Sequence, residues 1–284
     1  MAQNLNKTKR RIASVNSTKK MTNAMELVAT VKLGRYKSLL EKNRAYVEEI
    51  VNLIHTLFAR QIEGEENVFQ TENSATNNLY LVITSNLGLC ASFNNDVYKY
   101  VENNVSKENN DILIIGKKGN DHFSRLGYSL IDEYTSLNEK LVYEDVVKLS
   151  RNLTSLFTEG KYHSINIIYT KYVNSIKFVP EEIKIFPLGN LSSETNKELG
   201  YSPIFDPNVK TLIEELVPIY ITSLIYNKIV ESTVSEQASR RTAMDNATDN
   251  ANELIEQLTL EYNKARQTAI TQEITEVVSS SIDK

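Results

Sequence analysis

The amino-acid sequence predicts an α/β protein with a long antiparallel coiled coil, formed by its N- and C-terminal helices, and a central domain with a mostly parallel sheet. Three observations lead to this fold class. Eight of the nine glycines lie between Gly64 and Gly200, and helical patterns flank that region. Strand and helix signals alternate inside it. The stretch from Ile219 to Lys284 has no glycine and no proline, so as one helix its 66 residues would extend roughly 100 Å.

The N-terminal segment, about residues 4–60, is predicted to be one helix with Gly34 as its only glycine. Apolar residues recur there at spacings that are mostly sums of three and four. They are Ile12, Val15, Met25, Val28, Tyr36, Leu39, Val47, Ile50, Ile54 and Leu57.

The middle of the chain is predicted to be a Rossmann-like α/β domain, because apolar runs typical of buried strands alternate with helical segments. The expected strands are residues 79–86, 111–116, 164–173 and 181–188, and the expected helices are 91–107, a segment from about Asp121, and 141–158.

The C-terminal helix is expected to follow a turn at residues 202–207, with Asp206 as N-cap and Pro207 at the first helical position. A heptad seam indicates a helical partner, for which the N-terminal helix is the obvious candidate. The seam comprises Ala251, Ile255, Leu258, Tyr262, Ala265 and Ala269. The expected domains are therefore 1–62, 76–195 and 207–284.

The first 44 residues carry eleven Lys and Arg against Glu26 and Glu41, which is about nine net positive charges. This basic segment is either a solvated helix face, an organelle transit peptide, or a collar that meets acidic protein or phosphate. We disfavour a transit peptide, because the helical pattern continues past residue 57. Nucleic-acid binding is also disfavoured, because no aromatic residues are interleaved with the basic ones.

The sequence lacks the residues of an active site. GKKG (116–119) follows a strand but has neither the length nor the Ser/Thr of a phosphate-binding loop, so we interpret both glycines as turn residues. His55, His122 and His163 lack metal-ligand spacing. Cys90 is expected to be a small buried residue. We therefore expect a binding or mechanical part with no catalytic residue, cofactor or metal, no secretory signal and no membrane span.

Three passages closely resemble the gamma subunit of F-type ATP synthases, the central rotor stalk. They are IASVNSTKKMTNAMELVATVK (12–32), SEQASRRTAMDNATDNA (235–251) and LTLEYNKARQTAITQEITEVVSSS (258–281). The resemblance covers essentially the whole chain, including a central domain that begins with ITSNLGLC (83–90).

The resemblance implies a non-catalytic shaft that couples proton flow through the membrane c-ring to ATP synthesis or hydrolysis at the beta subunits. The implied partners are alpha and beta subunits around the coiled coil, and the epsilon subunit and c-ring at the α/β domain. The implied location is the cytoplasmic face of a bacterial membrane, as a peripheral protein. The partner-binding positions carried over from the family are Lys19, Lys20, Met25, Arg240, Gln267, Thr271 and Glu273.

One departure from the family lies after the first strand. The family usually reads T/S-D-R-G-L-C-G-G, whereas here Asn86 and Leu87 replace the Asp–Arg pair, and Ala91 and Ser92 replace the double glycine. This loss of charge motivates an alternative, the stalk of a paralogous rotary ATPase that lacks the proton channel.

Overall fold

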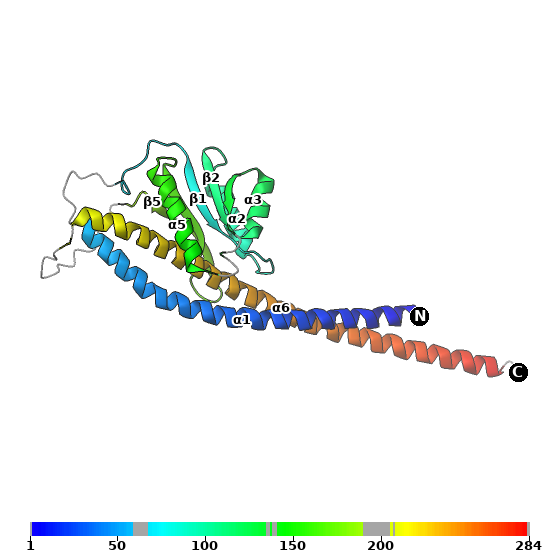
Figure 1. The fold of residues 1–284 in the computed structure, drawn as a ribbon. Helices are drawn as coiled ribbons and strands as arrows, with labels where there is room; N and C mark the ends of the chain where they lie inside the picture. Colours follow the sequence, from blue (N-terminus) through cyan, green and yellow to red (C-terminus); the bar gives the residue numbers. More distant parts are fainter. Residues whose placement is uncertain are drawn as a thin grey trace. The chain divides into compact units, whose positions relative to one another are not determined.

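The computed structural model describes residues 2–58, 68–134, 137, 141–189, 205–206 and 208–282. Its long helices are α1 (Ala2–Phe58) and α6 (Val209–Ile282) (Figure 1). The strands between them are β1 (Asn78–Ile83), β2 (Asn110–Ile115), β3 (Ser129–Glu133), β4 (Ser164–Tyr172) and β5 (Phe178–Phe186). The shorter helices are α2 (Phe93–Asn104), α3 (Lys117–Leu126) and α5 (Tyr143–Thr158).

The chain forms two compact units. The two-helix unit comprises residues 1–31 and 240–284, and the α/β unit comprises residues 32–239. Both long helices therefore run from one unit into the other, whereas the predicted domain boundaries follow the helix ends. The predicted domains 1–62, 76–195 and 207–284 therefore stay a prediction of how the chain divides by function.

The sheet of the α/β unit has the order β3-β2-β1-β4-β5. β1 is parallel to β2 and β4, β2 is parallel to β3, and only β5 runs antiparallel to its neighbour. This confirms the mostly parallel sheet. The sequence missed β3, because this short edge strand has no buried apolar run: Leu130 is half-buried and Ile131 is 45% exposed.

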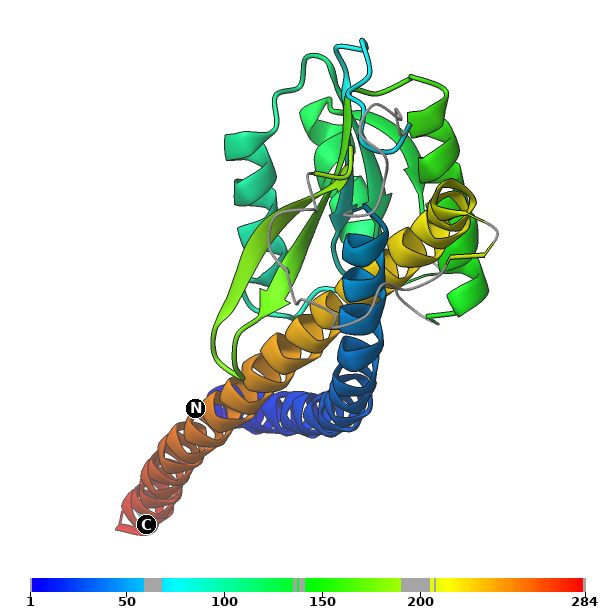
Figure 2. The same ribbon diagram turned by 90° about the vertical axis from the view of Figure 1, so that its left-hand side faces the viewer.

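Both faces of the sheet are covered, which explains the continuous apolar runs of its inner strands. Leu79, Leu81 and Ile83 belong to one core with side chains of α5, α6 and the end of α1. Tyr80 and Val82 belong to a second core with α2 and α3. Figure 2 shows these helices around the sheet from a second direction.

Two sequence expectations at helix starts were wrong. Helix α3 begins at Lys117 and not near Asp121, so Gly119 lies inside the helix, while Gly116 precedes it with φ +110°. Helix α6 begins at Val209, and the backbone N–H of Thr211 donates to the Asn208 side chain at 2.9 Å. Asn208 therefore caps α6 in place of Asp206, and Pro207 lies outside the described residues.

Candidate partner-binding surfaces

The two-helix unit is an antiparallel helix pair, because the start of α1 and the end of α6 lie at the same end of it (Figure 1). The hydroxyls of Thr22 and Thr248 meet at 2.7 Å across the pair. Along α6, Ala251 and Leu258 are buried, and the other four predicted seam residues are half-buried between exposed neighbours. This burial pattern agrees with the heptad seam.

The α1 side of the seam differs from the expectation. Its half-buried and buried positions include a row at alternating spacings of three and four: Ile12, Val15, Lys19, Thr22, Glu26 and Ala29. Met25 and Val28 lie off this row and are 38% and 56% exposed. The spacing of apolar residues correctly predicted the helix α1, but Met25 and Val28 do not belong to the buried row of that helix. The small side chain of Ala29, 1% exposed, takes the buried place.

All seven candidate partner-binding residues lie in the two-helix unit. Lys20, Met25, Gln267, Thr271 and Glu273 are exposed, whereas Lys19 and Arg240 are half-buried. The Thr271 hydroxyl donates to the backbone carbonyl of Gln267 at 2.9 Å, as expected for residues one turn apart. Their exposure makes five of the seven side chains accessible to another subunit.

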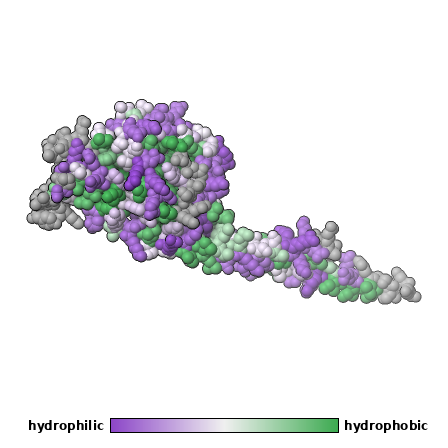
Figure 3. Space-filling view, viewed as in Figure 1, coloured by the Kyte–Doolittle hydropathy of each residue, from purple (hydrophilic) through white to green (hydrophobic). Residues whose placement is uncertain are grey.

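An apolar stripe that was not predicted from the sequence lies near the end of α6. Ile270, Ile274, Val277 and Val278 are 46%, 59%, 67% and 50% exposed. Hydrophobic surface is visible near that end of the helix in Figure 3. The spacing of four and three could have revealed the stripe, because it places these side chains on one helix face. An exposed apolar stripe of this kind is typical of a protein interface.

In the α/β unit, the loop after β1 occupies the start of α3. The backbone N–H groups of Lys117, Lys118 and Gly119 donate to Asn86 Oδ1 at 2.9 Å, to the Ser85 carbonyl at 3.0 Å and to Thr84 Oγ1 at 3.0 Å. A phosphate held at a helix start needs such N–H groups. The GKKG segment is therefore occupied by protein atoms, which agrees with its exclusion as a phosphate-binding loop.

The same loop presents apolar side chains to the solvent. Leu87 and Leu89 are 71% and 62% exposed, and Leu89 has a φ of +61°. Cys90 is 3% exposed, which confirms it as a small buried residue. Leu87, which stands where the family has arginine, therefore changes the surface of the loop and not its interior.

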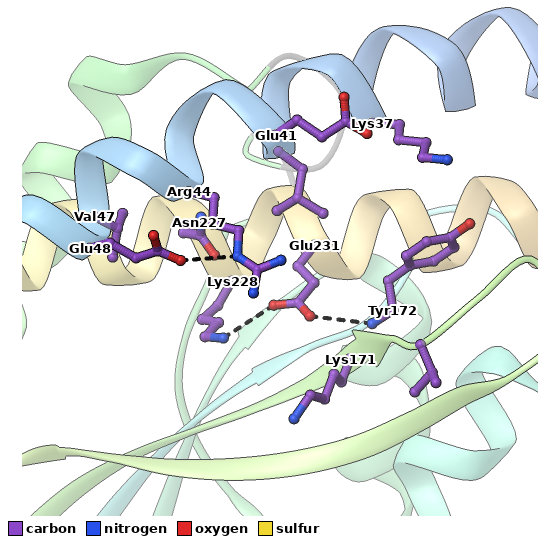
Figure 4. Close-up of a pocket in the computed structure, with 12 residues that line it drawn as sticks. Lys37, Glu41, Arg44, Val47, Glu48, Lys171, Tyr172, Asn227, Lys228 and Glu231 are labelled. Carbon is purple, nitrogen blue, oxygen red and sulfur yellow. Dashed lines mark hydrogen bonds and ion pairs between the residues drawn. The ribbon is translucent and has the colours of Figure 1, made fainter.

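A cavity of about 570 Å³ in the α/β unit is lined by α1, α6 and the end of β4 (Figure 4). Its charged residues are Lys37, Arg44, Lys171, Lys228, Glu41, Glu48 and Glu231. Arg44 pairs with Glu48, and Lys228 pairs with Glu231, each at 3.1 Å. Because carboxylates face the cations, the cavity offers little net attraction to a phosphate.

Two of the three histidines bond to separate parts of the α/β unit, and the His122 ring also stacks on that of Tyr98 with 3.9 Å between their centroids. His122 lies 2.8 Å from Glu102, and a ring nitrogen of His163 lies 3.0 Å from the Asn73 carbonyl. Across the described ranges, no three His, Cys, Asp or Glu side chains gather as metal ligands. None of the helices described here is both long and apolar enough to cross a membrane.

Comparison with known proteins identifies the family. The profile of a family described as ATP synthase matches residues 4–281. The chain is 37% identical to ATP synthase gamma chains of Clostridium pasteurianum and Mycoplasma capricolum, over 99% of each chain. It is 35% identical to the "ATP synthase gamma chain, sodium ion specific" of Acetobacterium woodii, over 99% of both chains. These names lend no support to a dedicated ATPase motor.

Solved structures share the fold. A chain of the Euglena gracilis mitochondrial ATP synthase matches 99% of this chain, with 94% of its own length covered, a TM-score of 0.68 and 16% identity. A chain of the Tetrahymena thermophila ATP synthase central stalk and c-ring matches 80% of this chain, with 99% of its own length covered, a TM-score of 0.58 and 23% identity. This chain therefore belongs to the ATP synthase gamma chain family and is a non-catalytic, peripheral subunit of the central stalk.

Proposed function

We propose that this chain is the rotating shaft that couples ion flow through a membrane c-ring to ATP synthesis and hydrolysis on beta subunits. The observation that carries the proposal is near full-length similarity to gamma chains. The outer surface of the helix pair supports it, because a shaft must present side chains to the ring around it. We retain 1–62 and 207–284 as the shaft and 76–195 as the α/β domain.

The alpha and beta subunits are the proposed partners of the two-helix unit. Lys20, Met25, Gln267, Thr271 and Glu273 contact them through exposed side chains, whereas Lys19 and Arg240 act from half-buried positions. The basic segment at the start of α1 would steer acidic loops of the ring toward it. The epsilon subunit and the c-ring are the proposed partners of the α/β unit.

The proposed location is the cytoplasmic face of a bacterial membrane, and the proposed driving ion is the proton. The bacterial origin of the relatives supports the location. Because the Acetobacterium woodii relative is named sodium ion specific, the assay must separate the two ions.

Affinity purification of the full chain from its own cells, followed by mass spectrometry, tests the proposal. We expect alpha, beta, epsilon and c subunits to be recovered together. The purified complex in sealed vesicles should then generate a membrane potential on ATP addition, without added sodium. Recovery of alpha and beta without c or epsilon would instead indicate a repurposed ATPase, and a strict sodium requirement would overturn the proton assignment.

A further inference from the structure

We propose that a row of four side chains on α6 holds this helix at a fixed rotation about its own axis within the α/β unit, and that the row thereby transmits torque from the α/β unit to α6. The four residues are Lys228, Glu231, Ser235 and Ser239. The inference rests on the proposed function as a shaft. It assigns a positioning role to residues outside the seven candidate partner-binding positions. We call these four residues the hydrogen-bond row.

Each member of the row bonds to a different point outside α6. Lys228 Nζ donates to the Tyr169 hydroxyl at 2.9 Å, and Glu231 accepts from the Tyr172 backbone N–H at 3.3 Å. The Ser235 hydroxyl shares its one proton between the Thr170 carbonyl at 3.2 Å and the Glu231 carbonyl of its own helix at 3.1 Å. The Ser239 hydroxyl donates to the Cys90 carbonyl at 2.7 Å. Spacings of three, four and four place the row on one helix face.

The row is shielded from water. Ser235 and Ser239 are 0% and 4% exposed, and the side chains of Lys228 and Glu231 are 16% and 12% exposed. Burial and the carboxylates of Glu231 and Glu181 raise the pKa of Tyr169. Its hydroxyl therefore stays protonated at neutral pH and donates to Glu181 while it accepts from Lys228.

The row begins where apolar packing of α6 gives way to polar packing. Ile213, Val217, Ile221, Ile225 and Ile229 pack the earlier turns into the core. Residues 232–239 are all buried, yet Val234 and Ala238 are their only apolar members. Apolar contact is non-directional, whereas a hydrogen bond weakens steeply when its angle changes. The row therefore resists rotation of the helix about its own axis better than apolar packing of equal area.

The hydrogen-bond row ends at the boundary between the α/β unit and the two-helix unit. Ser239 is the last residue of the α/β unit, and Arg240 is the first α6 residue of the two-helix unit. Both long helices join the two units, and the part of the torque that α6 carries from the α/β unit must enter this helix before Arg240. The bond from Ser239 to the Cys90 carbonyl is the last of the row before the helix leaves the unit.

The chain supplies a matched control on the same helix. Ser223 and Thr233 are 4% and 6% exposed, like the serines of the row. Their hydroxyls donate to the Ile219 and Ile229 carbonyls, both at 2.8 Å, within α6. S223A/T233V therefore removes two buried hydroxyls without breaking a bond to another element. S235A/S239A removes the shared bond from Ser235 to Thr170 and the bond from Ser239 to Cys90, both of which join α6 to another element.

The test uses the complete ATP synthase carrying each double variant. Ile176, 89% exposed at the β4–β5 turn, is replaced by cysteine to attach a bead, because native Cys90 is buried. The angular variance of the bead in nucleotide-paused complexes measures the compliance between the α/β unit and the ring. If the four bonds contribute equally to the torsional stiffness between α6 and the α/β unit, the loss of two bonds in S235A/S239A halves this stiffness. The part of the angular variance that comes from this connection should then about double, whereas S223A/T233V should leave it unchanged.

ATP-driven membrane potential, read with a voltage-sensitive dye, is the second measurement. We expect less potential per ATP hydrolysed in S235A/S239A, with unchanged amounts of assembled complex. Equal variance and equal potential in the two double variants would overturn the inference. If S235A/S239A fails to assemble, S239A alone gives the same comparison with a smaller expected rise. A wild-type complex that neither rotates nor generates a potential would instead overturn the proposed function.

Discussion

Ala91 is held in a backbone conformation that suits glycine. Its φ is +46°, in the left-handed region, at one of the two positions where the related family has a double glycine. A side chain in this region costs about 1–2 kcal/mol, which exceeds the entropy that glycine adds to the unfolded chain. Ala91→Gly should therefore stabilise the α/β unit by about 1 kcal/mol, as measured by chemical denaturation with circular dichroism.

Ser92 is the control for Ala91, because it stands at the other glycine position with an ordinary φ of −83°. Ser92→Gly should bring no gain, because it relieves no backbone strain and removes the hydrogen bond that the Ser92 hydroxyl donates to Asp96 at 2.7 Å. Equal stabilisation by both changes would show that backbone strain at Ala91 is not the cause.

Glu182 on β5 makes the stability of the α/β unit depend on pH. Burial raises the pKa of its carboxyl above the ordinary 4.5, opposed by a hydrogen bond from Tyr100 and the charge of Lys184. The protonated form is favoured by folding, so this contribution is full below the ordinary pKa and is lost as pH rises through the raised value. Glu182→Gln should melt higher than the wild type at about pH 7.5 and similarly at about pH 4.

Circular-dichroism melts of the full chain at the two pH values measure this difference. Glu108→Gln makes the same chemical change on an exposed side chain and should leave the melting temperature unchanged at both. A Glu182→Gln variant that melts lower than the wild type near pH 7.5 would contradict the desolvation argument.

At the scale of elements, the start of α3 depends on the loop after β1. Asn86 accepts the Lys117 N–H at 2.9 Å, where the related family has aspartate. A carboxylate would keep this bond and add attraction to the helix dipole, so Asn86→Asp should stabilise by about 0.3–1 kcal/mol. Asn86→Ala should destabilise by about 1 kcal/mol. Chemical denaturation that ranks alanine at or above asparagine would refute the capping role.

The sequence predicted well those elements whose burial produces a recognisable pattern of apolar residues along the element itself. β1 and β2 are covered on both faces and therefore show unbroken apolar runs. The start of α3 was missed because its first three N–H groups bond to residues 84–86, a contact between segments about 30 residues apart. Gly119 inside α3 has a similar cause, since a Cβ there would lie 2.5 Å from Thr84 Oγ1.

At the scale of the whole molecule, motif and heptad reasoning located the helix pair, but it could not decide which α1 side chains face α6. Met25 and Val28 are apolar yet exposed, whereas Glu26 is half-buried and Ala29 is buried. The hydrogen bond between Thr22 and Thr248 shows which residues of the two helices lie opposite each other, and the periodicity of a single helix does not contain that information. The hydrogen-bond row could not be predicted from the sequence either, because each of its bonds joins residues that are far apart in the chain.

The start of α1 and the end of α6 do not lie at the same height along the helix pair. With Thr22 opposite Thr248, antiparallel helices of equal rise place the start of α1 level with roughly residue 268. The last turns of α6 therefore extend beyond α1, and the side chains of Ile270, Ile274, Val277 and Val278 there are exposed. Removal of residues 277–284 should cost the chain little internal packing while removing contact surface for a partner.

We therefore expect truncation before Val277 to preserve assembly and to weaken coupling. The measurement is the yield of intact complex together with the ATP-driven membrane potential per ATP hydrolysed. Truncation after Ile282 is the control, because it keeps the exposed apolar stripe and should behave as the full chain does. A truncated chain that no longer assembles would place the end of α6 among the contacts that hold the complex together, since the helix pair itself loses none of its seam residues.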